Sequence, residues 1–381
     1  MTLKSKYLAI KVSKGLKYIV FGTNIVFIIL LVLSTFAPSI PPSHYMIFAF
    51  LGMGFPVLLV INVIYLILWI VFLQWKYILV SLLALACCWN SISTYIAFHE
   101  KTERIPYDCL KFMTYNVRGF DWLTGEDARE NPILEYIAAS GADIVCLQEF
   151  AVEEKKDIGK LISLEEFDDV MSDYPYRSII RLGDTKSSTI YGLACYSKYP
   201  IRKVARLPIE SAFNGSAMYE IQIGKKHITI VNNHLESNRL TAEDKALYKE
   251  LVENPNRAML GDVALNIKGH LAPAFRSRES QANIIANAIE LQRPETDAMV
   301  ICGDFNEPPI SYTYKKIKGN FSDSFKDTGA GIGITYHENG FWFRIDYIMH
   351  TKNMQSFNCF VDRVKYSDHY PLISYLFIRY I

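Results

Sequence analysis

The chain has 381 residues, with 40 Lys and Arg against 39 Asp and Glu, for a formal net charge of +1 at pH 7. Residues 1–99 contain six lysines and no Arg, Asp or Glu, so the rest of the chain holds 34 basic and 39 acidic residues, a net charge of −5. Proteins that bind nucleic acid without sequence preference usually carry the opposite sign, so this balance argues against that class. A local basic groove stays open, with these candidates: Arg239, Arg257, Arg276 and Arg278.

The first quarter of the chain is strongly apolar, and Lys76 is the single charged residue between residues 18 and 98. Three apolar runs follow one another: Tyr18–Ala37, Met46–Leu73 and Tyr77–Phe98. Each run reaches the ~20 residues that a helix needs to cross a bilayer. A cleaved signal peptide explains the first run poorly, because the run is too long and two more follow. Gly52, Gly54 and Pro56 predict a kink within the second run.

The lysines predict the orientation of this region in the membrane. Five of them precede the first run, and Lys76 separates the second run from the third, so the positive-inside rule places both positions in the cytoplasm. We therefore expect a cytoplasmic basic N-terminus (1–17), a multi-pass transmembrane region of about three helices (18–98) and an extracytoplasmic domain (101–381). If the second run is a re-entrant hairpin, the domain lies on the other side.

The remaining residues predict one large α/β domain. Apolar, strand-like runs recur along it: Leu110–Tyr115, Ile144–Leu147, Ile190–Tyr196, His227–Asn232, Met299–Cys302, Ile345–Met349 and Leu372–Ile378. Apolar residues at helical spacing predict helices over Asn131–Ser140 and Gln281–Leu291. Alternation over Arg202–Ile223, with a turn at Asn214-Gly215, predicts antiparallel strands. This alternation of strands and helices predicts a mixed β-sandwich flanked by helices.

The most informative segment is Val300–Pro308, V-I-C-G-D-F-N-E-P, where an apolar run breaks at Gly303. Asp304 and Asn306 follow at positions i and i+2, so on an extended chain both side chains face the same way. A carboxylate and an amide at the end of a buried strand suit the activation of water or the handling of phosphate.

Other strands of the predicted sheets also end or begin in polar residues. The set comprises Asn116, Glu149, His234, Asp346, Asp368 and His369. A buried strand tolerates Asp346 only with a partner, and His369 is the obvious candidate because a carboxylate fixes the tautomer of an imidazole. The hard oxygen ligands of Glu149 suit Mg²⁺ or Mn²⁺.

Together these segments resemble the endonuclease/exonuclease/phosphatase superfamily with its DNase I-like fold. The motifs that carry the resemblance are T-Y-N-V-R-G (Thr114–Gly119), C-L-Q-E (Cys146–Glu149), N-H-L-E-S (Asn233–Ser237), G-D-F-N-E-P-P (Gly303–Pro309), R-I-D-Y-I (Arg344–Ile348) and S-D-H-Y-P-L (Ser367–Leu372). The resemblance covers Leu110 to Ile381. It implies a four-layer α/β sandwich, here preceded by the transmembrane region.

The resemblance also implies roles for individual residues. Glu149 would be the main metal ligand, Asn116 would help to hold the metal or its phosphate, and Asp368 would lie near the metal or the histidine. Asp304 would orient or deprotonate the attacking water, and Asn306 would contact the phosphorane oxygens. His369, paired with Asp346, would contact the scissile phosphate, and His234 would act on the leaving side. The acidic partner that the family gives this first histidine is missing from Thr185–Gly192, which contains no carboxylate.

Several residues have two readings. Arg344, like Arg118, could bind substrate phosphate or form a structural ion pair. Glu236 could be a ligand or a solvated residue. The aromatic stretch Phe341-Trp342-Phe343 could form a substrate-facing wall or belong to the core.

The function predicted is a membrane-tethered, metal-dependent phosphoesterase, most readily a phosphodiesterase. Its phosphoester substrate could be a lipid, a small phosphodiester or nucleic acid, and the H-L-E-S segment resembles the tyrosyl-DNA phosphodiesterase branch. A membrane scaffold that keeps the fold without catalysis is the opposing hypothesis. The bilayer is the expected partner of the apolar region, and no protein partner can be inferred.

Overall fold

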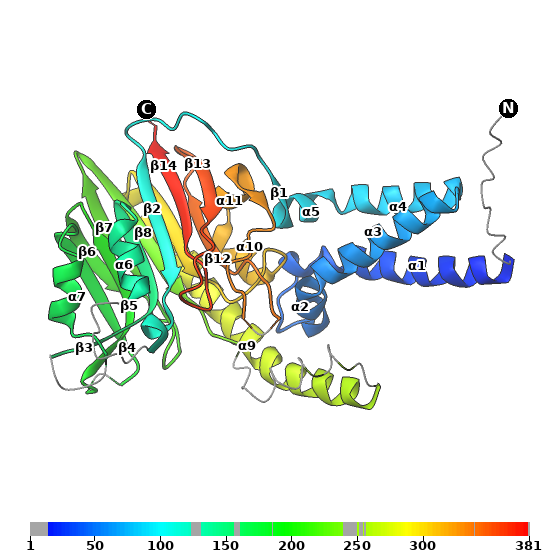
Figure 1. The fold of residues 1–381 in the computed structure, drawn as a ribbon, viewed down its shortest axis with the longest axis horizontal. Helices are drawn as coiled ribbons and strands as arrows, with labels where there is room; N and C mark the ends of the chain where they lie inside the picture. Colours follow the sequence, from blue (N-terminus) through cyan, green and yellow to red (C-terminus); the bar gives the residue numbers. More distant parts are fainter. Residues whose placement is uncertain are drawn as a thin grey trace, which may run out of the picture. The chain divides into compact units, whose positions relative to one another are not determined.

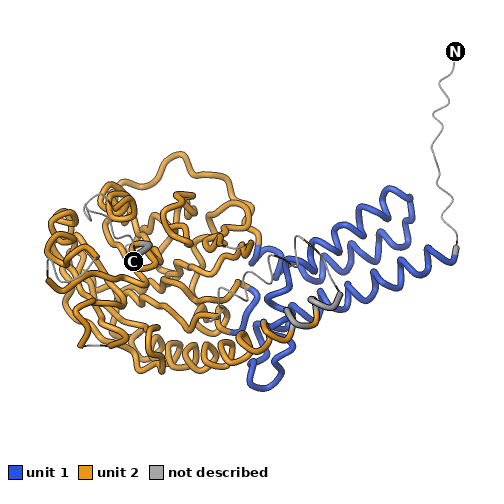
Figure 2. Tube along the Cα trace, turned by 60° about the horizontal axis from the view of Figure 1, so that its bottom comes forward, with its two compact units in different colours: residues 1–95, 310–312 blue, residues 96–309, 313–381 orange. Residues whose placement is uncertain are grey.

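The computed structural model describes residues 14–122, 131–155, 161–184, 186–238, 250, 254, 257–338 and 340–379. The chain forms two compact units (Figures 1 and 2), one of residues 1–95 with 310–312 and one of residues 96–309 with 313–381. Arg239 and three of the five N-terminal lysines lie outside the described residues, so their expected roles stay predictions.

The first unit is helical. Its elements are α1 (Lys14–Ser34), the short 3-10 helix η1 (Ala37–Ser39), α2 (Met46–Met53), α3 (Phe55–Val71), α4 (Trp75–Cys87) and α5 (Trp89–Tyr95). One helix, spanning Gly15–Ser39, is long and apolar enough to cross a membrane, and up to three spans result if each bent pair, α2–α3 and α4–α5, is one span. The predicted kink lies at Gly54, where α2 and α3 meet at 59° and Pro56 occupies the first turn of α3.

This helical unit has polar groups inside and apolar side chains outside. Asn24 is fully buried, and its Oδ1 accepts hydrogen bonds from Trp69 Nε1 (2.9 Å) and Ser81 Oγ (3.3 Å), which joins α1 to α3 and α4. Asn62 on α3 donates to the Phe27 carbonyl on α1 (3.1 Å). Large apolar side chains lie exposed on the surface of these helices, among them Val26, Ile29, Val57, Leu79 and Leu83. Hydrogen bonds between helices beneath an apolar surface are typical of packing in lipid.

The second unit contains two six-stranded sheets (Figure 1). The first has the order β13-β14-β2-β3-β5-β4, formed by β2 (Leu110–Asn116), β3 (Ile144–Glu153), β4 (Tyr176–Leu182), β5 (Thr189–Ser197), β13 (Met354–Val361) and β14 (Leu372–Ile378). The second has the order β10-β12-β9-β8-β7-β6, formed by β6 (Ile201–Arg206), β7 (Gly215–Ile223), β8 (Lys226–His234), β9 (Ala298–Asp304), β10 (Ser322–Asp323) and β12 (Asp346–His350). Two short strands pair separately: β1 (Ala97–Phe98) and β11 (Ala330–Gly331).

Helices cover the outer face of each sheet, which gives the four-layer α/β sandwich of the DNase I-like fold. The remaining helices are η2 (Arg118–Trp122), α6 (Pro132–Ala139), α7 (Leu164–Val170), α9 (Arg257–Gln292), η4 (Arg293–Glu295), α10 (Tyr312–Lys318) and α11 (Ser324–Thr328). One apolar cluster joins α6 and α7 to the first sheet, another joins α9 and α10 to the second, and a third fills the space between the sheets. The fold class expected from the sequence is confirmed.

Two local predictions about strands need correction. The strand that was expected to end at Leu147 continues to Glu153, past a bulge between Leu147 and Phe150. The tight turn expected at Asn214-Gly215 is instead the end of a longer connection, residues 207–214, between β6 and β7. In both places a polar residue lies inside or just before a strand, so polarity alone marks neither the end of a strand nor the position of a turn.

A pair of buried amides links the two sheets. Gln148 on β3 donates from Nε2 to Asn232 Oδ1 on β8 (2.6 Å) and to Thr114 Oγ1 on β2 (3.0 Å). Asn232 in turn donates to the Leu147 carbonyl (3.1 Å), and both amides are fully buried. Because buried polar groups cost free energy unless they are bonded, these contacts fix the two sheets in one register.

Gly303 allows β8 and β9 to lie close together just before the chain turns out of the sheet. Its φ is +112°, and a Cβ at this position would lie 2.0 Å from the Asn233 carbonyl oxygen. Only glycine adopts this conformation without strain, and only glycine fits the gap.

We expect Gly303→Ala to destabilise the second unit by about 3 kcal/mol or more, because it combines backbone strain with a clash against main chain. Gly224→Ala is the matched control: its φ is also positive (+61°), but nothing lies within 4 Å of the added Cβ. Strain alone should cost about 1 kcal/mol there. Thermal unfolding of the purified full-length variants measures both, and equal losses would contradict the role of close packing.

Candidate active site

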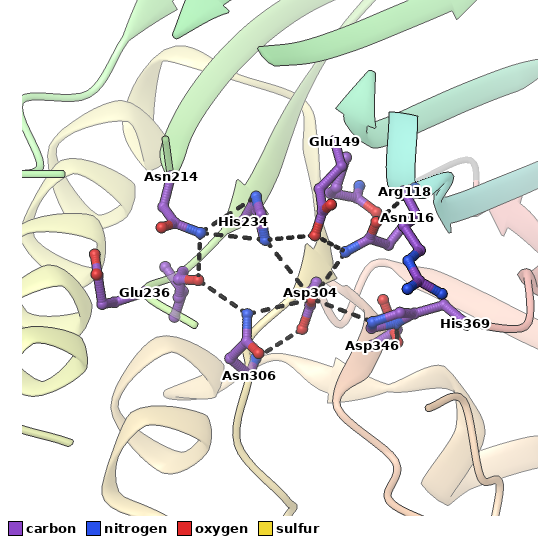
Figure 3. Close-up of polar contacts among 12 residues, drawn as sticks. Asn116, Arg118, Glu149, Asn214, His234, Glu236, Asp304, Asn306, Asp346 and His369 are labelled. Carbon is purple, nitrogen blue, oxygen red and sulfur yellow. Dashed lines mark hydrogen bonds and ion pairs between the residues drawn. The ribbon is translucent and has the colours of Figure 1, made fainter. Parts of the chain in front are cut away.

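The polar residues predicted from strand ends lie together at one edge of the two sheets (Figure 3). Asn116 ends β2 and Glu149 lies in β3 of the first sheet, whereas His234 ends β8 and Asp304 ends β9 of the second. The parallel pairing of β8 with β9 places His234 opposite Asp304, and the antiparallel pairing of β9 with β12 places Asp346 opposite Asp304. His369 reaches the same point from the segment before β14.

Asp304 is the centre of the cluster and is almost fully buried. Its carboxylate accepts hydrogen bonds from the Asn116 amide (3.1 Å), from the backbone N–H of Asn306 (2.8 Å) and from the Asn306 amide (3.3 Å). Burial and the neighbouring charge of Asp346 nevertheless raise the pKa of Asp304 to about 7. A carboxylate with a pKa near neutrality is suited to accept a proton.

His369 and Asp346 form the predicted pair. The Nδ1 of His369 lies 2.8 Å from Asp346 Oδ2, so Nδ1 carries the proton, and Nε2 lies 3.7 Å from Asp304 Oδ2. Burial alone would lower the pKa of His369, but the charges of Asp346 and Asp304 outweigh it and raise the pKa to about 10. His369 is therefore an imidazolium at neutral pH.

His234 has an amide as its partner. Asn214 Nδ2 lies within 3.3 Å of both ring nitrogens of His234 and also donates to the Leu235 carbonyl (2.9 Å). The Nε2 of His234 lies 3.5 Å from Glu149 Oε1. Burial lowers the pKa of His234 despite this carboxylate, so the ring is neutral at neutral pH. Among the described residues the nearest carboxylate to His234 is thus Glu149, and Asn214 is an additional partner, whose sequence signal was its place before a strand.

Glu149 lies in the bulge of β3, where its backbone departs from the extended conformation. Its φ is +52°, and its carboxylate, with 28% of the side chain exposed, accepts a hydrogen bond from Asn116 (3.1 Å). Arg118, Phe120 and Asn306, which flank the site, also have positive φ. Non-glycine residues keep such a conformation only where their surroundings enforce it, and they concentrate at functional sites.

A buried ion pair supports the loop that carries Asn306. Arg278 on α9 contacts Glu307 Oε1 through Nε (2.8 Å) and donates from Nη1 to the Glu236 carbonyl (2.6 Å). Arg278 is fully buried, so it belongs to this support and not to a basic groove, whereas Arg276 is exposed. Glu236 is also buried, and Figure 3 shows its carboxylate directed away from Asp304.

The first of the two roles considered for Arg344, binding of the substrate phosphate, does not match its position in the structure. Its side chain is completely buried, with the guanidinium 4.7 Å from the Phe325 ring centroid, so it has a structural role. Arg118 is the arginine beside the site: its side chain is 37% exposed and lies 3.1 Å from Glu338 and 3.8 Å from Asp368.

Two other predictions concern the rim of the site. The contacts of the Asp368 carboxylate are with Arg118 and Ser367, so its role near a metal stays a prediction. In the stretch Phe341-Trp342-Phe343, Trp342 is 64% exposed and therefore is not part of the core.

The cluster offers the kinds of ligand that a divalent cation needs. Glu149, Asp304 and Asp346 supply three carboxylates, against the single charge of the His369 imidazolium. Oδ1 of Asp346 is buried and has no hydrogen-bond partner among the residues that the structure describes. Asp304, Asp346 and His369 lie close enough to hold an ion together, but Nδ1 of the charged His369 is already bonded to Asp346. The Glu149 carboxylate is partly exposed and has Asn116 beside it, so its role as the main metal ligand stays a prediction.

Comparison with known proteins identifies the fold and the family. A model described as the endonuclease/exonuclease/phosphatase family matches residues 113–369, and one described as a domain of unknown function (DUF8431) matches residues 17–95. No curated protein sequence matches the chain.

Solved structures resemble the second unit. An endonuclease/exonuclease/phosphatase from Beutenbergia cavernae DSM 12333 is 15% identical, with a TM-score of 0.50 over 71% of this chain and 72% of that one. One from Bacteroides vulgatus is 18% identical, with a TM-score of 0.50 over 71% and 99%. At these identities the likeness shows the fold. Truncated TDP2 from Caenorhabditis elegans is 16% identical over 71% and 98%, with a TM-score of 0.47.

The pair of His369 and Asp346 should make stability depend on pH. The folded pKa of about 10 exceeds the ~6.5 of an unfolded histidine, so the stabilisation is complete below about pH 6.5 and is lost as the pH rises towards 10. Asp346→Asn removes the bonded carboxylate, so the unfolding temperature of this variant should fall less over that pH range.

The measurement is thermal unfolding of the full-length protein in detergent with EDTA, at a series of pH values. The exposed Asp173 provides the control, because Asp173→Asn should retain the slope of the wild-type protein. Equal slopes for Asp346→Asn and wild type would show that the pair does not titrate in this way.

Proposed function

The chain belongs to the endonuclease/exonuclease/phosphatase family, whose members hydrolyse phosphoester bonds, and on that premise we propose a membrane-tethered, divalent-metal-dependent phosphodiesterase. The observation that carries the proposal is the buried Asp304. This carboxylate, with a pKa near 7, lies between an imidazolium on one side and Glu149 and Asn116 on the other.

Asp304 is the proposed base. It accepts a proton from the attacking water as the new bond to phosphorus forms and the bond to the leaving oxygen breaks. Asn306 holds the carboxylate in place, since its amide donates to Asp304 (3.3 Å) and to the Leu235 carbonyl (3.0 Å). To contact a phosphoryl oxygen as well, Asn306 has to release one of these two bonds.

The two histidines have different proposed tasks because their charges differ. His369, kept protonated by Asp346, donates from Nε2 to a phosphoryl oxygen and stabilises the charge that develops there. His234 is neutral, so it donates a hydrogen bond on the leaving side without serving as a strong acid. Arg118, exposed at the rim, is placed to attract the phosphate.

Family members depend on a divalent metal, and Glu149 with Asn116 is the proposed place for it. Bound there, Mg²⁺ or Mn²⁺ would neutralise the charge of the phosphoryl group. The candidate substrates are a lipid, a small phosphodiester and nucleic acid. The net charge of −5 outside residues 1–99 is the observation that disfavours non-specific nucleases.

Turnover of a soluble aryl phosphodiester tests the chemistry. The purified full-length protein should cleave it with Mg²⁺ or Mn²⁺ and lose the activity in EDTA. Glu149→Gln and Asp304→Asn should each lower kcat by roughly 10²–10⁴-fold, the range for losing an acid–base or charge-stabilising group. The exposed residues Glu165 and Asp173 provide matched controls, as Glu165→Gln and Asp173→Asn.

A wild-type rate in either site variant would refute the role given to that residue. Absence of metal-dependent turnover on every phosphoester tried would favour the non-catalytic scaffold. A panel of plasmid DNA, a 5′-tyrosyl oligonucleotide, sphingomyelin and inositol phosphates then identifies the substrate class.

The helical unit is the proposed membrane tether, with three spans and the second unit outside the cytoplasm. Its exposed apolar surface and its hydrogen bonds between helices support insertion in lipid, and the proposed count of three takes each bent pair, α2–α3 and α4–α5, as one further span. An odd number of spans, with the basic N-terminus inside, sends the following residues to the far side.

Protease digestion of intact cells tests this orientation. Residues 101–381 should be cleaved without permeabilisation, while a cytoplasmic marker protein stays intact. Protection in intact cells, followed by cleavage after permeabilisation, would place the domain in the cytoplasm.

A further inference from the structure

A cavity in the second unit shares no lining residue with the candidate active site. It is a cavity of about 610 Å³, within the usual size of sites for small molecules. Its apolar lining comes from three parts of the chain: Phe325 on α11, Ile332 and Ile334 after β11, and Phe360 and Val361 on β13. Three basic residues complete one side of the lining: His99, Lys101 and Arg363.

Two residues that line the cavity, Gly333 and Asn358, have backbone conformations with positive φ. Gly333 has a φ of +69°, and a Cβ there would lie 2.4 Å from the Phe325 ring, so only glycine lets the segment pass over the ring. At a bulge in β13, Asn358 adopts a φ of +45° and its side-chain amide exchanges two hydrogen bonds with the backbone of Thr102 (2.7 and 2.8 Å). These contacts hold Lys101 at the cavity.

The charged side chains that line the cavity, Lys101 and Arg363, are both positive. No Asp or Glu lines the cavity, and no ion pair joins Lys101 or Arg363 to a carboxylate among the residues that the structure describes. Both side chains are exposed. The neighbouring Asp362 accepts a hydrogen bond from Tyr136 (2.8 Å) and does not line the cavity. A ligand that satisfies this site has an apolar part and a negative charge.

The position of the cavity along the chain indicates where such a ligand comes from. His99 follows Tyr95, the last residue of α5, by four residues, which can span at most ~14 Å. If α4 and α5 form a membrane span, as proposed above, the cavity is tied to the bilayer surface by the covalent chain. Two apolar residues of the lining, Ile332 and Phe360, are exposed, and so is Phe98, which precedes the lining residue His99.

We propose that this cavity binds one anionic phospholipid from the surrounding bilayer. An acyl chain lies among Phe325, Ile334 and Val361, and the headgroup phosphate contacts Lys101 and Arg363. Burial of methylene groups provides affinity, and the two cations select anionic lipid over zwitterionic lipid. The inference rests on the proposed membrane tether but not on the proposed chemistry.

Photo-crosslinking of the full-length protein in bilayer discs tests the proposal. The discs contain phosphatidylcholine and a phosphatidylglycerol probe with a photoreactive acyl chain, and mass spectrometry locates the attached lipid. We expect labelled peptides from residues 325–334 and 357–363. The double variant Lys101→Gln/Arg363→Gln should reduce this labelling by roughly thirtyfold, the order for losing two surface cations next to an anionic lipid.

Lys203→Gln/Arg206→Gln, which removes two exposed charges from β6, is the matched control and should label like the wild type. Labelling of α1 serves as an internal standard, and an unchanged unfolding temperature shows that each variant is folded. The proposal is overturned if the two peptides are not labelled, if a phosphatidylcholine probe labels them equally, or if the double variant has no effect. Lipid labelling and phosphodiester turnover are separate readouts, so failure of one is distinguishable from failure of the other.

Discussion

Two carboxylates, Asp304 and Asp346, lie opposite each other in the register of β9 and β12, and neither is accessible to water. Two negative charges that are buried close together repel each other, and the neighbouring side chains offset this repulsion. His369 is charged because it lies between them, Asn116 and Asn306 donate to Asp304, and the donor set retains an excess of negative charge that a cation can balance. Burying two carboxylates side by side is unfavourable for folding alone, and the proposed function gives this cost a purpose, since a metal and a phosphoryl group would use the same charges.

The fold and most of the site could be predicted from the sequence because both depend on local pattern. Apolar runs give the strands, and strand ends bring Asn116, Asp304 and Asp346 to one edge of the sandwich. Asn214 could not be predicted, because its contact with His234 depends on how a loop folds back onto a strand that follows it. The burial of Arg344 depends likewise on Phe325, which is distant in sequence.

The helical unit inverts the usual placement of polar and apolar groups. Asn24 and Asn62 are inside, where they join helices, and large apolar side chains are outside. In water this arrangement would expose most of what hydrophobic burial normally removes, whereas in lipid it satisfies both kinds of group. This placement is what the proposed membrane tether requires of the helical unit.

The amide link between the sheets has a consequence for how the enzyme would respond to its surroundings. Gln148 and Asn232 cannot gain or lose a proton at any pH at which proteins survive, yet they lie on β3 and β8, the strands that also carry Glu149 and His234. The hydrogen-bonded link between the two sheets therefore does not itself titrate. Acidification or alkalinisation can change the charges of Asp304 and His369 while this link between the sheets keeps its hydrogen bonds, so the pH-dependent part of the stability comes from the pair of His369 and Asp346 and not from the two amides.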